Sequence, residues 1–215
     1  MAGSSGPNTI ASAALLKLAG VLFIAMLAQI ARAGAPVLLD CGVVALDMNT
    51  ADIGEAGPEY PLGTVALAQA SREFGLPTYS CALHCEAKIG DVQAGLEKMA
   101  GMMSALLGGV DVTTNMGMLS RCSAASYEQL LVDHELCAFL ERFGRGVTAD
   151  DDTLALDVIR EVGLGGNFIT HEHTVKHCRS GEIWYPTLLD RSATGNEAVD
   201  LYQKAHVQVQ EILES

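Results

Sequence analysis

The stretch "PVLLDCGVVALDM", residues 36–48, is an almost continuous apolar run that begins just after Gly34. A run without alternating polar residues is typical of a strand buried on both faces of a parallel sheet. It follows a long apolar helical pattern over residues 9–32 and precedes a loop over 49–63 and a helical pattern over 64–75. The sequence therefore predicts a buried strand between two helices.

The same order of segments recurs along the chain, with units that begin about 35 residues apart, as expected of strand–helix repeats in a parallel sheet. No GxGxxG motif follows a strand, and the chain has no P-loop. We expect one α/β domain over residues 1–215, a (β/α) barrel of the TIM type or part of one, with an open doubly wound sheet as the alternative. The remaining expected segments are strands at 76–85, 110–119 and 167–174, and helices at 91–109, 126–146, 148–166 and 196–215.

Side-chain caps predict where several of these helices begin. Asp91, Ser126 and Thr148 each precede a helical pattern, as N-cap residues do. The three acids of "TADDDT" are explained by the helix dipole, so we assign them no metal site. Met99, Met102 and Met103 recur at helical spacing and are expected in the core.

Composition excludes several classes of function. The 215 residues have a formal net charge of -13, which argues against nucleic-acid binding because phosphates require a basic surface. Six cysteines occur without a CxxC motif, as in a cytoplasmic protein with reduced thiols. The apolar segment over residues 9–32 has no Lys or Arg before it and is interrupted by Lys17, Gln29 and Arg32. We expect it to be a buried helix, and neither a signal peptide nor a membrane span.

In parallel barrels the working residues lie at the carboxyl ends of strands. Four predicted strand ends contribute polar side chains and together form the candidate active site. They contribute Asp47; His84 and Glu86; Asn115; and His171 with His173.

The segment "GGNFITHEHTVKH", residues 165–177, contains three histidines. On an extended strand, His171 and His173 would point to one face, as two zinc ligands do, with His84 or Asp47 as a third. Histidines that bind hydrogen-bond partners or orient a substrate are the commoner alternative. Spacing alone leaves both interpretations open.

The chain resembles the corrinoid-dependent trimethylamine methyltransferase family, which includes glycine betaine methyltransferases. The resemblance extends over nearly the whole chain, and its blocks occur in the family's order. They are "SSGPNTIASAALLKLAGVLFIAMLAQIARAGAPVLL", "LDMNT", "GPEY", "FGLPTYSCALHCEAKIGDVQAGLEK", "SYEQLLVDHE", "LALDVIREVGLGGNFITHEHTVKH" and "WYPTLLDR".

The resemblance implies the C-terminal half of a (β/α)₈ barrel, because family members are about twice as long. It implies methyl transfer from a methylated amine to the Co(I) of a separate corrinoid protein, with no cofactor bound directly and no metal in the site. Archaeal trimethylamine enzymes contain pyrrolysine, whereas this chain shows standard residues only. It is therefore similar to the non-pyrrolysine type, whose substrates are quaternary amines such as glycine betaine.

For this chemistry we expect His84, Glu86 and Asn115 to be the catalytic residues. Asp47, Tyr60, Tyr79, His171 and His173 are expected to bind substrate: a carboxylate, Glu86 or Asp47, would face the cation and Tyr60 or Tyr79 would offer an aromatic face to it. His84 or Asn115 would bind a substrate carboxylate.

Half a barrel has open sheet edges, so we expect a homo-oligomer or an N-terminal barrel half as partner, and no activity from this chain alone. The alternatives are a zinc-dependent barrel hydrolase that uses His171, His173 and His84, and a non-catalytic half-barrel that binds a partner.

Overall fold

A three-stranded parallel sheet organises the chain in the computed structural model, which describes residues 1–191 and 200–215. Its strands β1 (Leu39–Asp40), β4 (Thr78–Ser80) and β5 (Val112–Thr113) lie side by side in chain order. The α/β class with a parallel sheet is therefore confirmed. Sequential strand order is typical of barrels, and the TIM-barrel half stays a prediction.

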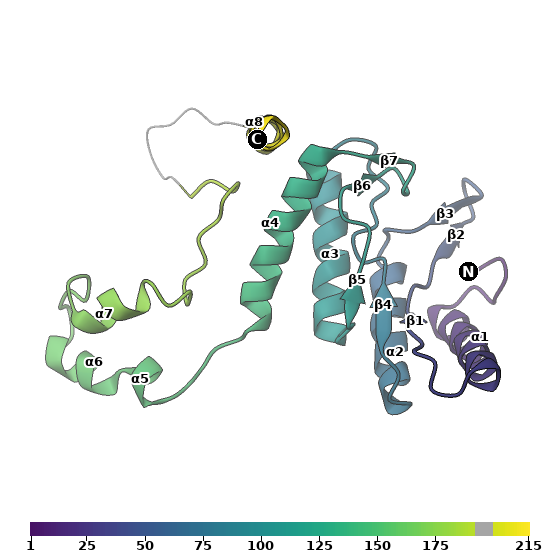
Figure 1. Cartoon of the computed structure of the whole chain (residues 1–215), viewed down its shortest axis with the longest axis horizontal. Coiled ribbons are helices and arrows are strands. Elements are labelled where there is room, and N and C mark those ends of the chain that lie inside the picture. The colour runs from purple at the N-terminus through teal and green to yellow at the C-terminus, as the bar shows by residue number, and fades with distance from the viewer. Residues whose placement is uncertain (192–199) are drawn as a thin grey trace.

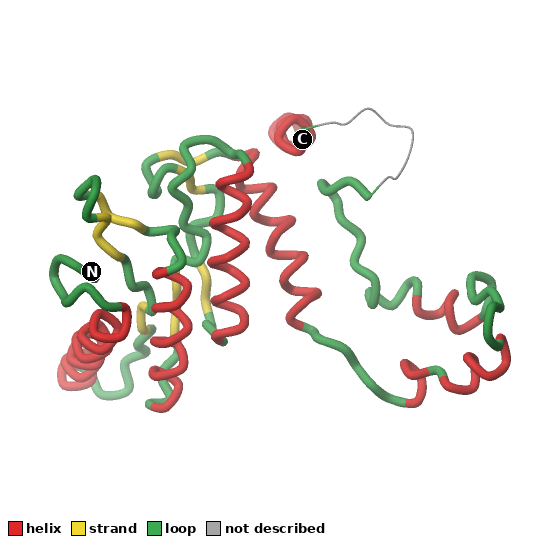
Figure 2. Tube along the Cα trace, turned by 180° about the vertical axis from the view of Figure 1, so that it is seen from behind, coloured by secondary structure: helices red, strands yellow, loops and turns green. Residues whose placement is uncertain are grey.

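Three helices follow the strands and lie next to one another: α2 (Glu59–Glu73), α3 (Val92–Gly108) and α4 (Tyr127–Gly144) (Figure 1, Figure 2). On the helix side of β4, Ser80 Oγ lies 3.2 Å from the Tyr60 hydroxyl and 3.4 Å from that of Thr64. Tyr79, between Thr78 and Ser80, therefore faces the opposite side of the sheet. Helix α2 lies on the first of these two faces.

The smaller elements surround this unit. Helix α1 (Ile10–Ala31) packs against α2, and α8 (Leu201–Glu214) packs across α4. Two antiparallel hairpins lie beyond the strand ends. They are β2 (Ala45–Asp47) with β3 (Asp52–Gly54), and β6 (Met118–Leu119) with β7 (Ala124–Ala125).

The predicted caps explain where the main helices begin. Thr9, Asp91 and Ser126 accept hydrogen bonds from the backbone N–H groups of Ser12, Ala94 and Gln129. Each bond satisfies an N–H that the helix itself leaves free. The predictions for Asp91 and Ser126 are confirmed.

Small residues let the helices approach the sheet closely. A Cβ at Gly101 of α3 would lie 2.1 Å from the backbone oxygen of Ala82, so only glycine fits there. Beside this contact, Met102 is buried with Leu83, Ala105 and Leu140. Met99 and Met103 pack against the same cluster, which confirms the predicted methionine core.

One ion pair is fully buried. Lys98 of α3 and Asp133 of α4 have side chains that are 1% and 0% exposed, and Lys98 Nζ lies 2.8 Å from Asp133 Oδ2. The ammonium also donates to Leu83 O, while Asp133 accepts from Gly117 N and Gln129 Nε2. The pair thus joins two helices to the segments that follow β4 and β5.

Residues 36–48 were expected to form a buried strand and its exit loop, and the predicted strand end at Asp47 and Met48 is wrong. Cys41 N still donates to Tyr79 O, but Gly42 N donates to the Asp40 side chain and the chain leaves the sheet. Residues 45–47 then pair with 52–54, inside the predicted loop. The apolar run therefore contains two short strands, because a run alone does not show where a ladder ends.

The prediction that the first helix is buried is also wrong within this chain. Only Ala13, Ala14 and Ala25 of α1 are buried, while Phe23 is 53% and Ile30 74% exposed. In the described part of the chain, α1 is the one helix long and apolar enough to cross a membrane by length and composition. That this helix does not span a membrane stays an expectation.

Residues 147–183, here called the extension, lie apart from the sheet (Figure 1). The predicted helix over 148–166 is divided at Ala155, whose φ of 49° is left-handed, into α5 (Asp151–Leu154) and α6 (Leu156–Val162). Its N-cap is Asp150, not Thr148. The predicted strand over 167–174 is wrong: helix α7 (Glu172–His177) occupies its second half.

After the extension, residues 187–189 return to α4 and bind Glu135. This buried carboxylate accepts hydrogen bonds from Thr187 N, Thr187 Oγ1, Leu188 N and Leu189 N at 2.6–3.3 Å. Burial would raise the pKa of Glu135, but these bonds lower it below its ordinary value. The predicted helix over 196–215 is present from Leu201, and its first residues lie outside the described part.

Replacing Lys98 with Met tests the buried pair. We expect Lys98→Met to lower the free energy of unfolding by about 3–5 kcal/mol, because Asp133 would remain buried without its partner. Urea denaturation at pH 7 measures the change. Arg145→Ala, which breaks an exposed pair with Glu141, is the control and should change stability little. Equal stability losses in the two variants would contradict the assignment.

Candidate functional site

A pocket of about 270 Å³ lies where β1 and β4 end, between α1 and the start of α2. Its polar lining combines the phenol of Tyr60, the imidazole of His84 and an ion pair of Asp40 with Lys17. The other lining residues are Met1, Ala13, Gly42, Val43, Val44 and Cys81. The pocket therefore joins the two predicted site residues Tyr60 and His84.

Tyr60 is fixed by hydrogen bonds at the end of β4. Its hydroxyl accepts from Cys81 N at 3.0 Å and lies 3.2 Å from Ser80 Oγ. Burial raises the pKa of Tyr60, so the phenol stays protonated. The ring centroid lies 5.3 Å from that of His84.

His84 has unused hydrogen-bonding capacity. Its Nδ1 is buried and has no hydrogen-bond partner among the described residues. Burial lowers the pKa of His84, although Glu55 and Asp40 oppose this shift. The imidazole is therefore neutral at pH 7 and available to a bound molecule.

Asp40 is the pocket's carboxylate and was not among the predicted site residues. It forms an ion pair with Lys17 of α1, and its Oδ1 accepts from Gly42 N at 2.9 Å. The signal was the aspartate inside "PVLLD", which marks the true end of the first strand. Asp47 lies beyond it on the exposed β2–β3 hairpin, where a bond from Asn49 N lowers its pKa.

Glu86 follows β4, and its carboxylate already has partners within the chain. Its Oε1 accepts from Glu55 N at 2.7 Å and lies 3.7 Å from Arg121 Nε. Arg121 also binds Asp52 at 2.9 Å. The carboxylate therefore holds the β3 region to the β6–β7 region.

Asn115 follows β5 in a left-handed conformation, with a φ of 78°. Its Oδ1 accepts from Thr114 Oγ1 at 2.7 Å, and its Nδ2 donates to Cys122 Sγ at 2.8 Å. Burial raises the pKa of Cys122. All six cysteines are free, and burial raises the pKa of Cys41 to about 11.

Tyr79 does not line the pocket with Tyr60, because it faces the opposite side of the sheet from Ser80, which contacts Tyr60. Burial is the main cause that raises its pKa. His84, Glu86 and Asn115 share the strand-end region, whereas Tyr79 and Asp47 lie outside the pocket. Their roles in substrate binding stay predictions.

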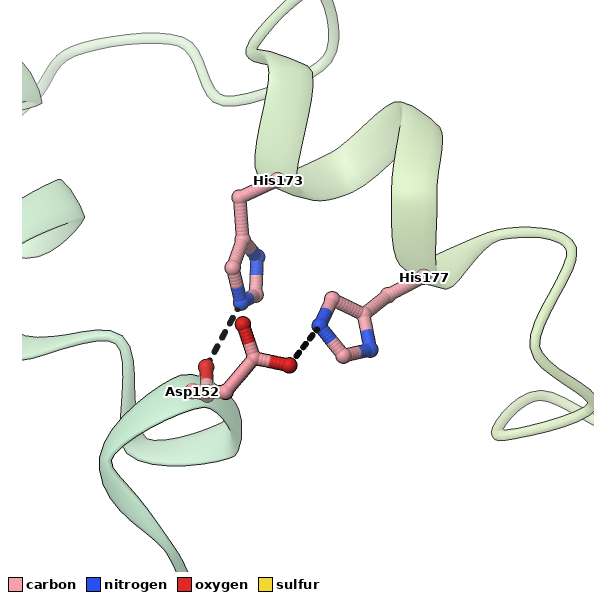
Figure 3. A group of neighbouring side chains, drawn as sticks. All are labelled: Asp152, His173 and His177. Atoms are coloured by element: carbon pink, nitrogen blue, oxygen red, sulfur yellow. Dashed lines mark hydrogen bonds and ion pairs between the residues drawn. The ribbon is translucent and has the colours of Figure 1, made fainter.

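The histidines of the extension are far along the chain from this pocket and are arranged by α7. His171 is the N-cap and accepts from His173 N, so the two rings do not share a strand face. His173 and His177, one turn apart, instead point together at Asp152 of α5 (Figure 3). The expected zinc set with His84 is not brought together in the described residues.

Comparison with known proteins agrees with the resemblance seen in the sequence. The family model for trimethylamine methyltransferase (MTTB) matches residues 1–215. A glycine betaine methyltransferase of Desulfitobacterium hafniense strain Y51 is 38% identical over 99% of this chain and 45% of its own length.

Trimethylamine methyltransferases show weaker similarity over the same extent. Those of Desulfitobacterium hafniense DCB-2 and Methanosarcina barkeri strain Fusaro are 31% and 30% identical over the whole chain and 44% of their own length. The chain thus spans about half the length of the curated relatives that it matches. It belongs to the trimethylamine methyltransferase family.

Proposed function

We propose that the chain is the substrate-binding half of a methyltransferase that moves a methyl group from a quaternary amine to the Co(I) of a separate corrinoid protein. The observation that carries the proposal is the family match over all 215 residues, together with 38% identity to a glycine betaine methyltransferase. The corrinoid is a substrate on its carrier protein, and the chain binds no cofactor directly. We also propose a cytoplasmic location.

The chemistry needs orientation more than activation. The methyl carbon on a quaternary nitrogen is electrophilic without a Lewis acid. When the C–N bond breaks, its electron pair stays with the departing amine, and the electron pair of Co(I) forms the new bond to carbon. The chain's residues would hold the amine so that one methyl group points toward the acceptor.

The pocket at the strand ends has complementary charges for a zwitterion. The Asp40 carboxylate and the Tyr60 ring would face the trimethylammonium group. The Lys17 ammonium and the free Nδ1 of His84 would face the carboxylate of glycine betaine. Glu86 and Asn115 follow β4 and β5 but are not among the residues that line this pocket, and their catalytic roles stay proposals.

The exposed face of α1 favours a partner-binding role as a second candidate. Large apolar side chains cover this face, and all are 44–74% exposed. They are Leu15, Leu16, Phe23, Ile24, Met26, Leu27 and Ile30. A contiguous apolar face of this kind marks a protein interface, which a second copy of the chain or an N-terminal barrel half would cover.

Methyl transfer is tested by mixing the chain with a corrinoid protein reduced to Co(I) and a panel of methylated amines. We expect no methyl transfer from the chain alone, and with an N-terminal barrel half added we expect methylcobalamin absorbance to grow faster with glycine betaine than with trimethylamine. His84→Ala should slow this growth about tenfold or more through lost substrate orientation. His134→Ala, an exposed histidine on α4, should leave the rate unchanged. If every amine leaves the absorbance unchanged with that half present, the partner-binding role replaces methyl transfer for this chain.

Charge complementarity is tested by calorimetric binding of two ligands to Lys17→Met. We expect about tenfold weaker binding of glycine betaine, because its carboxylate loses a charged partner. Tetramethylammonium, which has no carboxylate, should bind unchanged or more tightly, because Asp40 loses its competing cation. Lys88→Met, at an exposed position, is the control. An equal loss of affinity for glycine betaine and for tetramethylammonium would contradict the pocket assignment.

Sedimentation velocity tests how the α1 face is covered. We expect Phe23→Glu to reduce association of the chain, because a charge on the apolar face opposes its burial. Leu164→Glu, at a fully exposed position of the extension, should not. A defined wild-type dimer supports a second copy, and a monomer that binds detergent through α1 supports a barrel half. A monomer that binds no detergent contradicts an interface there.

A further inference from the structure

We propose that Asp152, His173 and His177 form a binding site for a divalent transition-metal ion of the zinc class, and that the ion joins α5 to α7. One ligand atom from each residue lies within 4.8 Å of the other two (Figure 3). The site is distinct from the strand-end pocket and does not depend on the proposed methyl transfer.

The local fold explains why the three groups converge. His173 and His177 are four residues apart on α7, so both rings lie on one side of the helix. Their centroids are 4.2 Å apart at an interplanar angle of 35°. The carboxylate of Asp152 comes from α5, which α6 separates from α7 along the chain. Asp152 is one of the three acids for which no metal site was expected. Two histidines one helical turn apart plus a carboxylate from another segment is a common zinc ligand set.

One distance between ligand atoms is close to that around a coordinated ion: His177 Nε2 lies 3.2 Å from Asp152 Oδ2. His173 Nε2 lies 2.8 Å from the backbone oxygen of Asp152, a hydrogen bond that a bound ion would replace. In a tetrahedral zinc site, ligand atoms are about 3.3 Å apart, given bonds of about 2.0–2.1 Å. Small side-chain rotations would therefore bring the three ligand atoms onto one ion.

His177 Nε2 is buried and forms no hydrogen bond in the described structure, where its contact is the ion pair with Asp152 Oδ2 at 3.2 Å. Buried polar atoms nearly always form hydrogen bonds, and an exception can mark an absent water or ion. A cavity of about 420 Å³ beside His173, lined also by Asp151 and Asp157, would admit water to the open coordination position.

Lys176 competes for the same carboxylate. Its Nζ lies 2.7 and 2.6 Å from the two Asp152 oxygens, and its hydrogen bond is the main cause that lowers the pKa of Asp152. A metal ion would have to displace this ammonium. The competition gives a test in which a substitution strengthens binding, an effect that damage to the fold would not produce.

The test measures zinc content of the full chain after desalting and zinc affinity by competition with a chelating dye. We expect stoichiometric zinc in the wild type and at least about tenfold weaker binding in His177→Gln and Asp152→Asn. Lys176→Met should bind zinc about tenfold more tightly, because a positive charge leaves the site. His134→Gln removes a histidine outside the cluster and should keep wild-type affinity.

Cobalt substitution identifies the ligands. We expect visible bands of a four-coordinate Co²⁺ site without a thiolate charge-transfer band, although Cys178 is adjacent to His177. The proposal is overturned by no stoichiometric zinc in the wild type, by unchanged affinity in His177→Gln, by a thiolate band, or by loss of binding in Lys176→Met.

Discussion

The buried ion pair between Lys98 and Asp133 determines how the helices meet the strand ends. Two charges removed from water are costly unless each finds several partners. Here the partners include Leu83 O and Gly117 N, so the pair is satisfied only when α3, α4 and both strand exits are in place. His84 follows Leu83 directly, and its position therefore depends on the same pair.

The strand-end pocket combines a balanced charge pair with a neutral imidazole. Its charges cancel internally, whereas the chain as a whole has a formal net charge of -13. A strongly acidic surface concentrates cations near the protein without selecting among them. Selection would then arise in the pocket, where an ammonium and a carboxylate must be matched at once.

The strand–helix order, the caps at Asp91 and Ser126 and the methionine core were predictable, because each depends on residues close in sequence. The division of residues 36–48 was not, since hydrogen-bond partners decide where a ladder ends, and Asp40 was missed for this reason. The short histidine segment satisfies both strand and helix spacing over its length. Local pattern therefore could not show that His173 pairs with His177.

Glu135 binds the residues that follow the extension to α4, the helix from which the extension departs. The chain leaves α4 at its carboxyl end and is bound again to its middle, at Thr187 and the next two residues. Loop-closure entropy rises only slowly with loop length. A change in the number of residues between these anchors would therefore cost the sheet little free energy.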